Sequence, residues 1–182
     1  MLSIAGRYLY KYIIQPWWEQ QKLKLVMSIS QERSINNALA QILLILKADR
    51  CLLLQFDKDT KPHPTIICNN EICAPGVSEV ATLVNRSNCC TSRSYEILSK
   101  AVGPNYRLIN DVENAGYRNF LMSIGVKKLV TLPIKLEDRF LGCIVVHWIE
   151  SNDAEEWDFQ KIEQQFAIVS DTLLNIELAG KP

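Results

Sequence analysis

The stretch GYRNFLMSIGVKKLVTLPIKLEDRFLGCIVVHW, residues 116–148, decides the fold. Its first part predicts a short helix that ends at Gly125, because glycine readily adopts the left-handed conformation that closes a helix. Two apolar runs follow, residues 127–136 and 139–150, and the two acidic residues 137–138 separate them. This pattern predicts a β-hairpin whose apolar strands form the centre of a sheet.

Further strands and helices are predicted on the N-terminal side of this hairpin. Residues 51–56 and 65–73 are apolar runs joined by a turn rich in Asp, Lys and Pro, which favours an antiparallel pair. Residues 107–110 predict a short strand, and residues 77–84 have helical spacing. Together with helices at both ends, these elements predict an α+β fold, with a central antiparallel sheet and the N- and C-terminal helices on one face.

The two terminal helices carry regular apolar stripes. Residues 19–47 have helical periodicity, and Ser34 is a candidate cap at a break between two helices. In the last helix, Asp153 and Glu156 form a candidate capping box, and Gly180 is the expected end. The apolar positions of this helix start at Phe159, and five of them predict a homodimer interface: Ile162, Phe166, Val169, Leu173 and Ile176. The competing interpretation is that both helices cover their own sheet.

Composition limits the classes of function. The 182 residues predict one domain, residues 19–180, preceded by an aromatic arm, residues 1–18. Twenty basic and twenty acidic residues give a net charge of zero, which argues against nucleic-acid binding. No transmembrane segment or secretory signal is apparent, so a cytoplasmic protein is expected. The arm could make peripheral membrane contact, or it could pack on its own domain or on a twin subunit.

The six cysteines are expected to be free thiols in a reducing compartment. Cys51 and Cys143 lie in strongly apolar runs, which indicates core packing. The other four, Cys68, Cys73, Cys89 and Cys90, lack the spacing of common zinc or iron–sulfur sites. No metal is therefore expected, although ligands can also converge from distant segments.

Four segments together resemble the GAF domain, particularly the GAF domains of cyanobacteriochromes and their phytochrome-like relatives. They are ADRCLLLQFD, RLINDVENAG, GVKKLVTLPIKLEDRFLGCIVVHW and EEWDFQKIEQQFAIVSDTLLNIELA, within about residues 31–179. The resemblance implies a ligand pocket between the sheet and residues 73–84 and 111–120. The candidate ligand-binding residues are Cys73, Asp111, Tyr117, Phe120 and His147. His147 could instead be a satisfied strand histidine.

The resemblance also raises the question of a covalent bilin. In pigmented relatives a Cys-His dipeptide lies on the helix before the hairpin, whereas here that segment reads AGYRNFLMSIGV and contains neither residue. Some relatives use a second cysteine in an Asp-x-Cys-Phe motif, and residues 71–74, EICA, match only its acid and thiol. We therefore expect no covalent chromophore and no other cofactor, with an atypical bilin-binding photoreceptor as an alternative.

No catalytic group is evident. His63 and His147 are the only histidines, no Ser-His-Asp or Cys-His pair is suggested, and the seven glycines form no phosphate-binding loop. We expect a non-catalytic sensory or regulatory module. It would bind an unlinked small ligand or an unidentified protein partner and signal through a helical dimer interface. The alternative is a structural or assembly protein whose pocket is filled by Tyr117, Phe120, Met122 and Trp148.

Overall fold

The computed structural model describes residues 15–57, 65–86, 100, 104–136, 139–149 and 159–179. The chain divides into two compact units, Met1–Ser34 and Ile35–Pro182. Helix α2 (Gln15–Ile45) begins in the first unit and ends in the second. The break expected at Ser34 is therefore wrong. The preference of serine for helix caps is weak, and an unbroken helix carries Ile35, Leu39 and Ile42 into the core.

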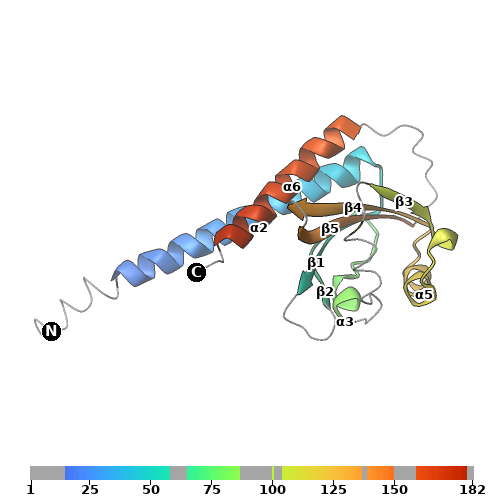
Figure 1. Ribbon diagram of the computed structural model, residues 1–182, viewed down its shortest axis with the longest axis horizontal. Helices are drawn as coiled ribbons and strands as arrows, with labels where there is room; N and C mark the ends of the chain where they lie inside the picture. Colours follow the sequence, from blue (N-terminus) through green and yellow to red (C-terminus); the bar gives the residue numbers. More distant parts are fainter. Residues whose placement is uncertain are drawn as a thin grey trace, which may run out of the picture. The chain divides into compact units, whose positions relative to one another are not determined.

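Five antiparallel strands form one sheet in the order β2-β1-β5-β4-β3 (Figure 1). The strands are β1 (Arg50–Asp57), β2 (Thr65–Cys73), β3 (Asn105–Leu108), β4 (Lys128–Leu136) and β5 (Arg139–Trp148). The predicted hairpin, β4 and β5, lies inside the sheet, and β2 and β3 are its edges. Strand β3 begins and ends two residues earlier than predicted, because Ile109–Asp111 form a short 3-10 helix, η2.

One face of the sheet is covered by the second part of α2 and by α6 (Phe159–Ala179) (Figure 1). Alternate strand residues point toward these helices, as the two-residue period of a strand requires. Trp148 is fully buried here, and its indole Nε1 donates to the Leu46 carbonyl oxygen at 3.3 Å. We call this apolar group the helix-side core, and it includes Leu39, Ile42, Cys51, Leu53, Val130, Ile144, Val146, Trp148, Val169 and Leu173. The prediction of both terminal helices on one face is confirmed.

The opposite face is covered by α3 (Ala81–Arg86), η2 and α5 (Ala115–Ser123). The Asn114 side chain caps α5 by accepting from the Tyr117 backbone N–H at 2.9 Å. Gly125 follows α5 with φ 80°, as its predicted role at the helix end requires. We call the apolar group on this face the loop-side core, and it includes Leu52, Leu54, Phe56, Cys68, Val80, Val84, Leu121, Leu129, Cys143 and Val145.

Most of the apolar side chains in the α6 stripe are buried within their own chain. Ile162, Val169 and Leu173 are buried in the helix-side core, and Phe166 is partly buried against it. Ile176 remains 41% exposed. Val169 and Leu173 thus pack inside their own chain, because α6 runs along the sheet and the helix-side core extends to Leu173.

Several predicted features lie outside the described residues: most of the aromatic arm, the hairpin turn at residues 137–138, Cys89, Cys90, and the capping box of Asp153 and Glu156. Among the described residues, no helix is both long enough and apolar enough to span a membrane. Within the same residues, no group of His, Cys, Asp or Glu side chains is arranged to hold a metal ion.

Candidate functional site

An ion pair is buried between β1 and β2, on the loop-side face of the sheet. Arg50 pairs in register with Cys73, and Leu52 pairs with Glu71, so these side chains share one face. The Arg50 Nε lies 3.3 Å from the Glu71 Oε1, and the two side chains are only 2% and 4% exposed. Buried charges are normally paired in this way, because an isolated charge in low dielectric is costly.

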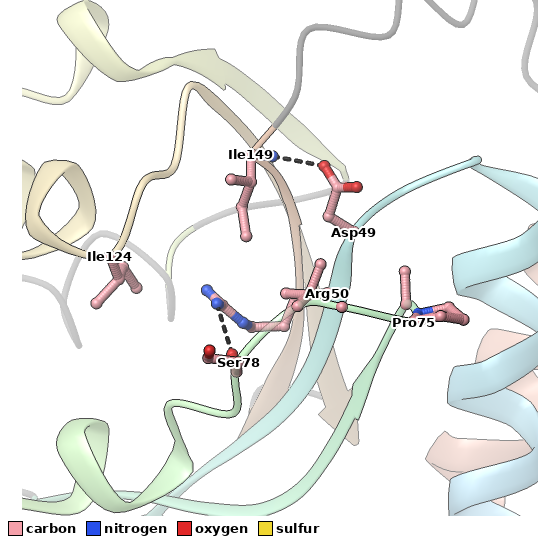
Figure 2. A pocket seen from close by; sticks show the side chains of 9 residues that line it. Asp49, Arg50, Pro75, Ser78, Ile124 and Ile149 are labelled. Atoms are coloured by element: carbon pink, nitrogen blue, oxygen red, sulfur yellow. Dashed lines mark hydrogen bonds between the residues drawn. The ribbon is translucent and has the colours of Figure 1, made fainter.

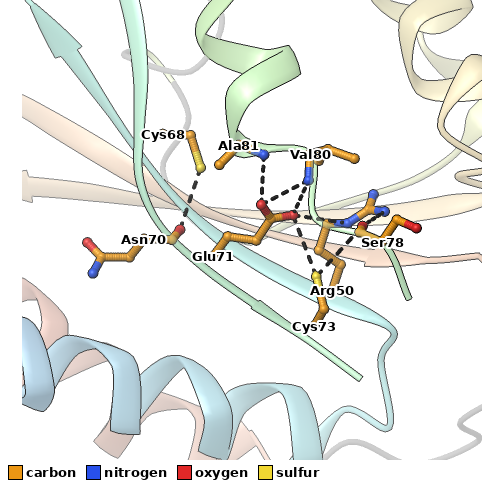
Figure 3. A network of polar contacts seen from close by, with 8 residues as sticks. All are labelled: Arg50, Cys68, Asn70, Glu71, Cys73, Ser78, Val80 and Ala81. Carbon is orange, nitrogen blue, oxygen red and sulfur yellow. Dashed lines mark hydrogen bonds and ion pairs between the residues drawn. The ribbon is translucent and has the colours of Figure 1, made fainter. Parts of the chain in front are cut away.

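Both partners of the pair hold the segment that follows β2. The Glu71 carboxylate accepts from the backbone N–H of Val80, at 2.8 and 2.9 Å to its two oxygens, and from that of Ala81 at 2.7 Å (Figure 3). Arg50 donates from Nη2 to the Ser78 carbonyl oxygen at 2.9 Å. Glu71 therefore caps the start of α3.

Helix α3 is also attached to β2 through Asn85. Its Oδ1 accepts from the Cys68 backbone N–H at 2.7 Å, and its Nδ2 donates to the Cys68 carbonyl oxygen at 3.2 Å. One side-chain amide thus satisfies both backbone groups of a single strand residue, as a neighbouring strand would.

The cysteine thiols of this face are poorly suited to nucleophilic chemistry. The Cys73 Sγ lies 3.6 Å from the Glu71 Oε1 and 3.9 Å from the Ser78 carbonyl oxygen. Burial, and then the negative charge of Glu71, raise the pKa of the Cys73 thiol. Burial raises the pKa of Cys68 and that of Cys143 to about 12. The reactive thiolate is therefore scarce at neutral pH.

His147 lies beside the ion pair, because β5 pairs with β1 so that His147 is opposite Arg50. Its ring is 3% exposed, and neither ring nitrogen has a hydrogen-bond partner among the described residues. Burial, and then the positive charge of Arg50, lower the pKa of His147 to about 3. The imidazole is therefore neutral at physiological pH.

A cavity of about 450 Å³ opens at this end of the sheet (Figure 2). Its wall is formed by Asp49 and Arg50 at the start of β1, residues 74–78 after β2, Ile124 after α5 and Ile149 after β5. Gly76 has φ 87°, which allows residues 74–78 to turn across the opening. The Asp49 Oδ2 accepts from the Ile149 backbone N–H at 2.6 Å and so ties β1 to the end of β5.

The predicted ligand-binding residues divide into two groups. Cys73 and His147 lie next to the Arg50–Glu71 pair, although neither lines the cavity. Tyr117 and Phe120 are partly buried on α5 against the loop-side core, and Asp111 is exposed in η2. The space expected to hold a ligand, between the sheet and α3, η2 and α5, contains the loop-side core, and the cavity lies at its end.

Two of the proposed pocket plugs are wrong. Trp148 points to the opposite face of the sheet, because it is one residue from His147 in a strand. Met122 is 57% exposed on the outside of α5. The residues that sequence reasoning missed are Arg50 and Glu71. The available signal was a charged residue at the start of the run RCLLLQF and another one inside TIICNNEIC.

Comparison with known proteins identifies the architecture. The phycoerythrobilin-bound GAF domain from a cyanobacterial phytochrome matches with a TM-score of 0.66 and 16% identity, over 90% of this chain and 95% of that one. The chain has the GAF fold. The PixJ GAF domain of Thermosynechococcus elongatus, described as its blue-light absorbing form, gives a TM-score of 0.57 and 19% identity over 85% and 89% of the two chains.

A further match is to a domain whose name mentions no chromophore. A domain named as part of a two-component sensor histidine kinase protein from Sinorhizobium meliloti has a TM-score of 0.51 and 17% identity, covering 80% of this chain and 90% of that one. No protein-family model matches the chain, and no curated protein matches it either. At these identities the resemblance extends to the fold alone.

Proposed function

We propose that this chain is a sensory GAF module that acts by binding rather than by catalysis. The observation that carries the proposal is the cavity of about 450 Å³ beside a buried ion pair, with the Arg50 side chain on its wall. Pockets of roughly 300–1,000 Å³ are typical of small-molecule sites. The Cys73 thiol has a raised pKa, and His147, with a pKa of about 3, is a very weak base, which supports binding over chemistry.

The binding would be passed on through α3 and the residues that precede it. Arg50 lines the cavity and also binds Ser78, while its partner Glu71 caps α3. A ligand that moves Arg50 therefore changes the contacts of residues 78–81 directly. The output would reach a partner chain, in a homodimer or through another protein.

Mass spectrometry of protein purified under native conditions tests this function. We expect a small molecule at stoichiometric amounts, and we expect it to be lost on denaturation because it is not covalently attached. A cavity-filling variant, Val77→Trp, should abolish co-purification, whereas Asn119→Trp on an exposed position of α5 is the matched control. Retention of the molecule by Val77→Trp would contradict a site in this cavity.

The alternative is a structural or assembly protein that binds no small molecule. Its support is the loop-side core, in which apolar side chains occupy the space between the sheet and its covering elements. If native protein is free of small molecules and a pull-down with the same chain captures one stoichiometric protein partner, the assembly function replaces the sensory one.

A further inference from the structure

Two of the three nitrogens of the Arg50 guanidinium, Nε and Nη1, have no hydrogen-bond partner among the described residues. Its Nε faces Glu71, and its Nη2 donates to Ser78, but its Nη1 is buried and has no hydrogen-bond partner among the described residues. Figure 2 shows the guanidinium extended between Ile124 and Ser78, two other residues of the cavity wall. A buried donor without an acceptor is unfavourable, so an acceptor supplied there would be bound favourably.

The charges around the cavity argue against an ionic ligand. Glu71 already balances the positive charge of Arg50, and Asp49 adds a second carboxylate to the wall. His147 contributes no positive charge, because its pKa of about 3 leaves it neutral. An anion would therefore meet no net positive charge, and it would lose its hydration beside two carboxylates.

A cation is disfavoured for a different reason. Glu71 is 4% exposed and already accepts from Val80 and Ala81 while facing Arg50. The Asp49 Oδ2 is bound to the Ile149 backbone N–H. A ligand ammonium group at Glu71 would have to displace contacts that cap α3, and beside Arg50 it would meet a charge of its own sign.

Apart from Ser78, the remaining wall residues have no polar side chain: Ala74, Pro75, Gly76, Val77, Ile124 and Ile149. These residues come from three separate segments, and none of them carries a charge that a ligand could contact. The volume of about 450 Å³ is large enough for a bicyclic ring system.

We propose that the cavity binds a neutral molecule with an apolar ring body and a carbonyl oxygen that accepts a hydrogen bond from the Arg50 Nη1. This inference rests on the proposed function and names its ligand class. Because Nη1 is shielded from water, the Arg50 side chain must turn toward the cavity before the carbonyl can reach it, and the carbonyl gives up its hydration shell there. An uncharged oxygen loses the least free energy in that step.

Three probes of similar size and different charge test the ligand class: naphthalene-2-carboxamide, naphthalene-2-carboxylate and 2-naphthylmethylamine. Each is titrated into the 182-residue chain, and the backbone amide signals are followed by NMR. We expect the carboxamide to bind at least tenfold more tightly than the other two. It should shift the amides of Gly76, Val77, Ser78 and Ile149, which lie at the cavity, and those of Val80 and Ala81, which Glu71 holds.

Two variants locate the carbonyl. Arg50→Met combined with Glu71→Gln removes the donor without leaving an unpaired charge, and it should weaken carboxamide binding about tenfold. Val77→Trp keeps the ion pair and should block all binding, so the test survives if the double variant does not fold. Unchanged affinity in a folded double variant would overturn the role of Nη1.

The remaining outcomes separate this inference from the proposed function. If the carboxylate or the amine binds most tightly and shifts the same amides, the neutral ligand class is wrong and the cavity is still a binding site. If no probe shifts these amides and native protein also carries no small molecule, the inference and the small-molecule form of the proposed function both fall.

Discussion

The Arg50 guanidinium and the Glu71 carboxylate meet where neither has access to water, and they act as a unit. Removing one charge leaves the other buried without compensation, which typically costs about 3–5 kcal/mol. Removing both leaves only the changes in packing and hydrogen bonding. Removing one member of the pair should therefore destabilise the protein more than replacing both members.

A double-mutant cycle tests this coupling. We expect Arg50→Met to lower the free energy of unfolding by about 3 kcal/mol or more, and the added Glu71→Gln to restore part of that loss. Glutamine keeps an oxygen that can accept from the Val80 and Ala81 N–H groups, so the cap on α3 is retained. Urea unfolding of the wild type, both single variants and the double variant gives the coupling energy. Additive losses would show that the two charges do not interact.

His147 predicts a loss of stability in weak acid. Its pKa is about 3 in the folded protein, against an ordinary value of 6.5. Between these values the unfolded chain binds a proton that the folded chain excludes, so stability falls as pH drops below 6.5. One such group contributes a slope of at most about 1.4 kcal/mol per pH unit.

The measurement is urea unfolding of wild type and His147→Leu at several pH values between 7 and 5. Glu71, Asp49 and the other carboxylates are common to both proteins, so the difference between the two pH profiles isolates His147. We expect a shallower profile in the variant. Parallel profiles would mean that the imidazole reaches solvent and takes up a proton without unfolding.

At the scale of single elements, the prediction that the chain carries no covalent bilin rests on α5. Its sequence, AGYRNFLMS, contains no cysteine or histidine. The thiol of the EICA segment, Cys73, lies beside a carboxylate and has a raised pKa, so it is a poor nucleophile toward a vinyl group. The GAF fold is present, and α5 lacks the Cys-His dipeptide that the resemblance to pigmented relatives leads one to look for.

We therefore expect no covalent chromophore after co-expression with enzymes that supply phycocyanobilin. The measurement is zinc-induced fluorescence of the denatured protein on a gel, with a pigmented cyanobacteriochrome domain as the positive control. A fluorescent band that is lost in Cys73→Ala would instead assign the bond to that thiol.

The sequence predicted the strands well, because their apolar runs are long and are bounded by clear turn residues. The hairpin of β4 and β5 and the pair of β1 and β2 follow from local pattern alone. The break at Ser34 was predicted wrongly, because burial of the residues that follow outweighs a local capping preference. The local apolar pattern was enough to locate the strands, whereas the uninterrupted course of α2 depends on tertiary packing.

The candidate site was only partly predictable. Cys73 and His147 were selected for their chemical type and do lie beside the ion pair. Arg50 and Glu71 are 21 positions apart and meet only through the register of two strands, including a shift between Leu53 and Leu54. That shift cannot be obtained from apolar periodicity, so their contact could not be predicted from the sequence.

At the scale of the whole molecule, α6 has a buried side and an exposed side. Val169 and Leu173 are 0% and 4% exposed, whereas Ile168 and Ile176 are 40% and 41% exposed. Any homodimer contact made by this helix must therefore use the exposed side. The exposed apolar side chains, rather than the complete stripe, are the candidates for an interface.

Two pairs of substitutions on α6 separate folding from association. Val169→Glu with Leu173→Glu should unfold the protein, because two charges would enter the helix-side core. Ile168→Glu with Ile176→Glu should leave a folded protein and dissociate a dimer that forms through this side. Circular dichroism reports folding, and analytical ultracentrifugation reports mass. A wild type that is monomeric at tens of micromolar would rule out this dimer.

The contact between Asn85 and Cys68 has a consequence for solubility. Strand β2 is an edge of the sheet, and exposed edge strands tend to recruit strands from other chains, which leads to aggregation. The Asn85 amide occupies both the donor and the acceptor that Cys68 would offer such a strand. A second chain could extend the sheet at this point only after displacing α3. Helix α3 thus also hinders a strand of another chain from pairing with the edge strand β2.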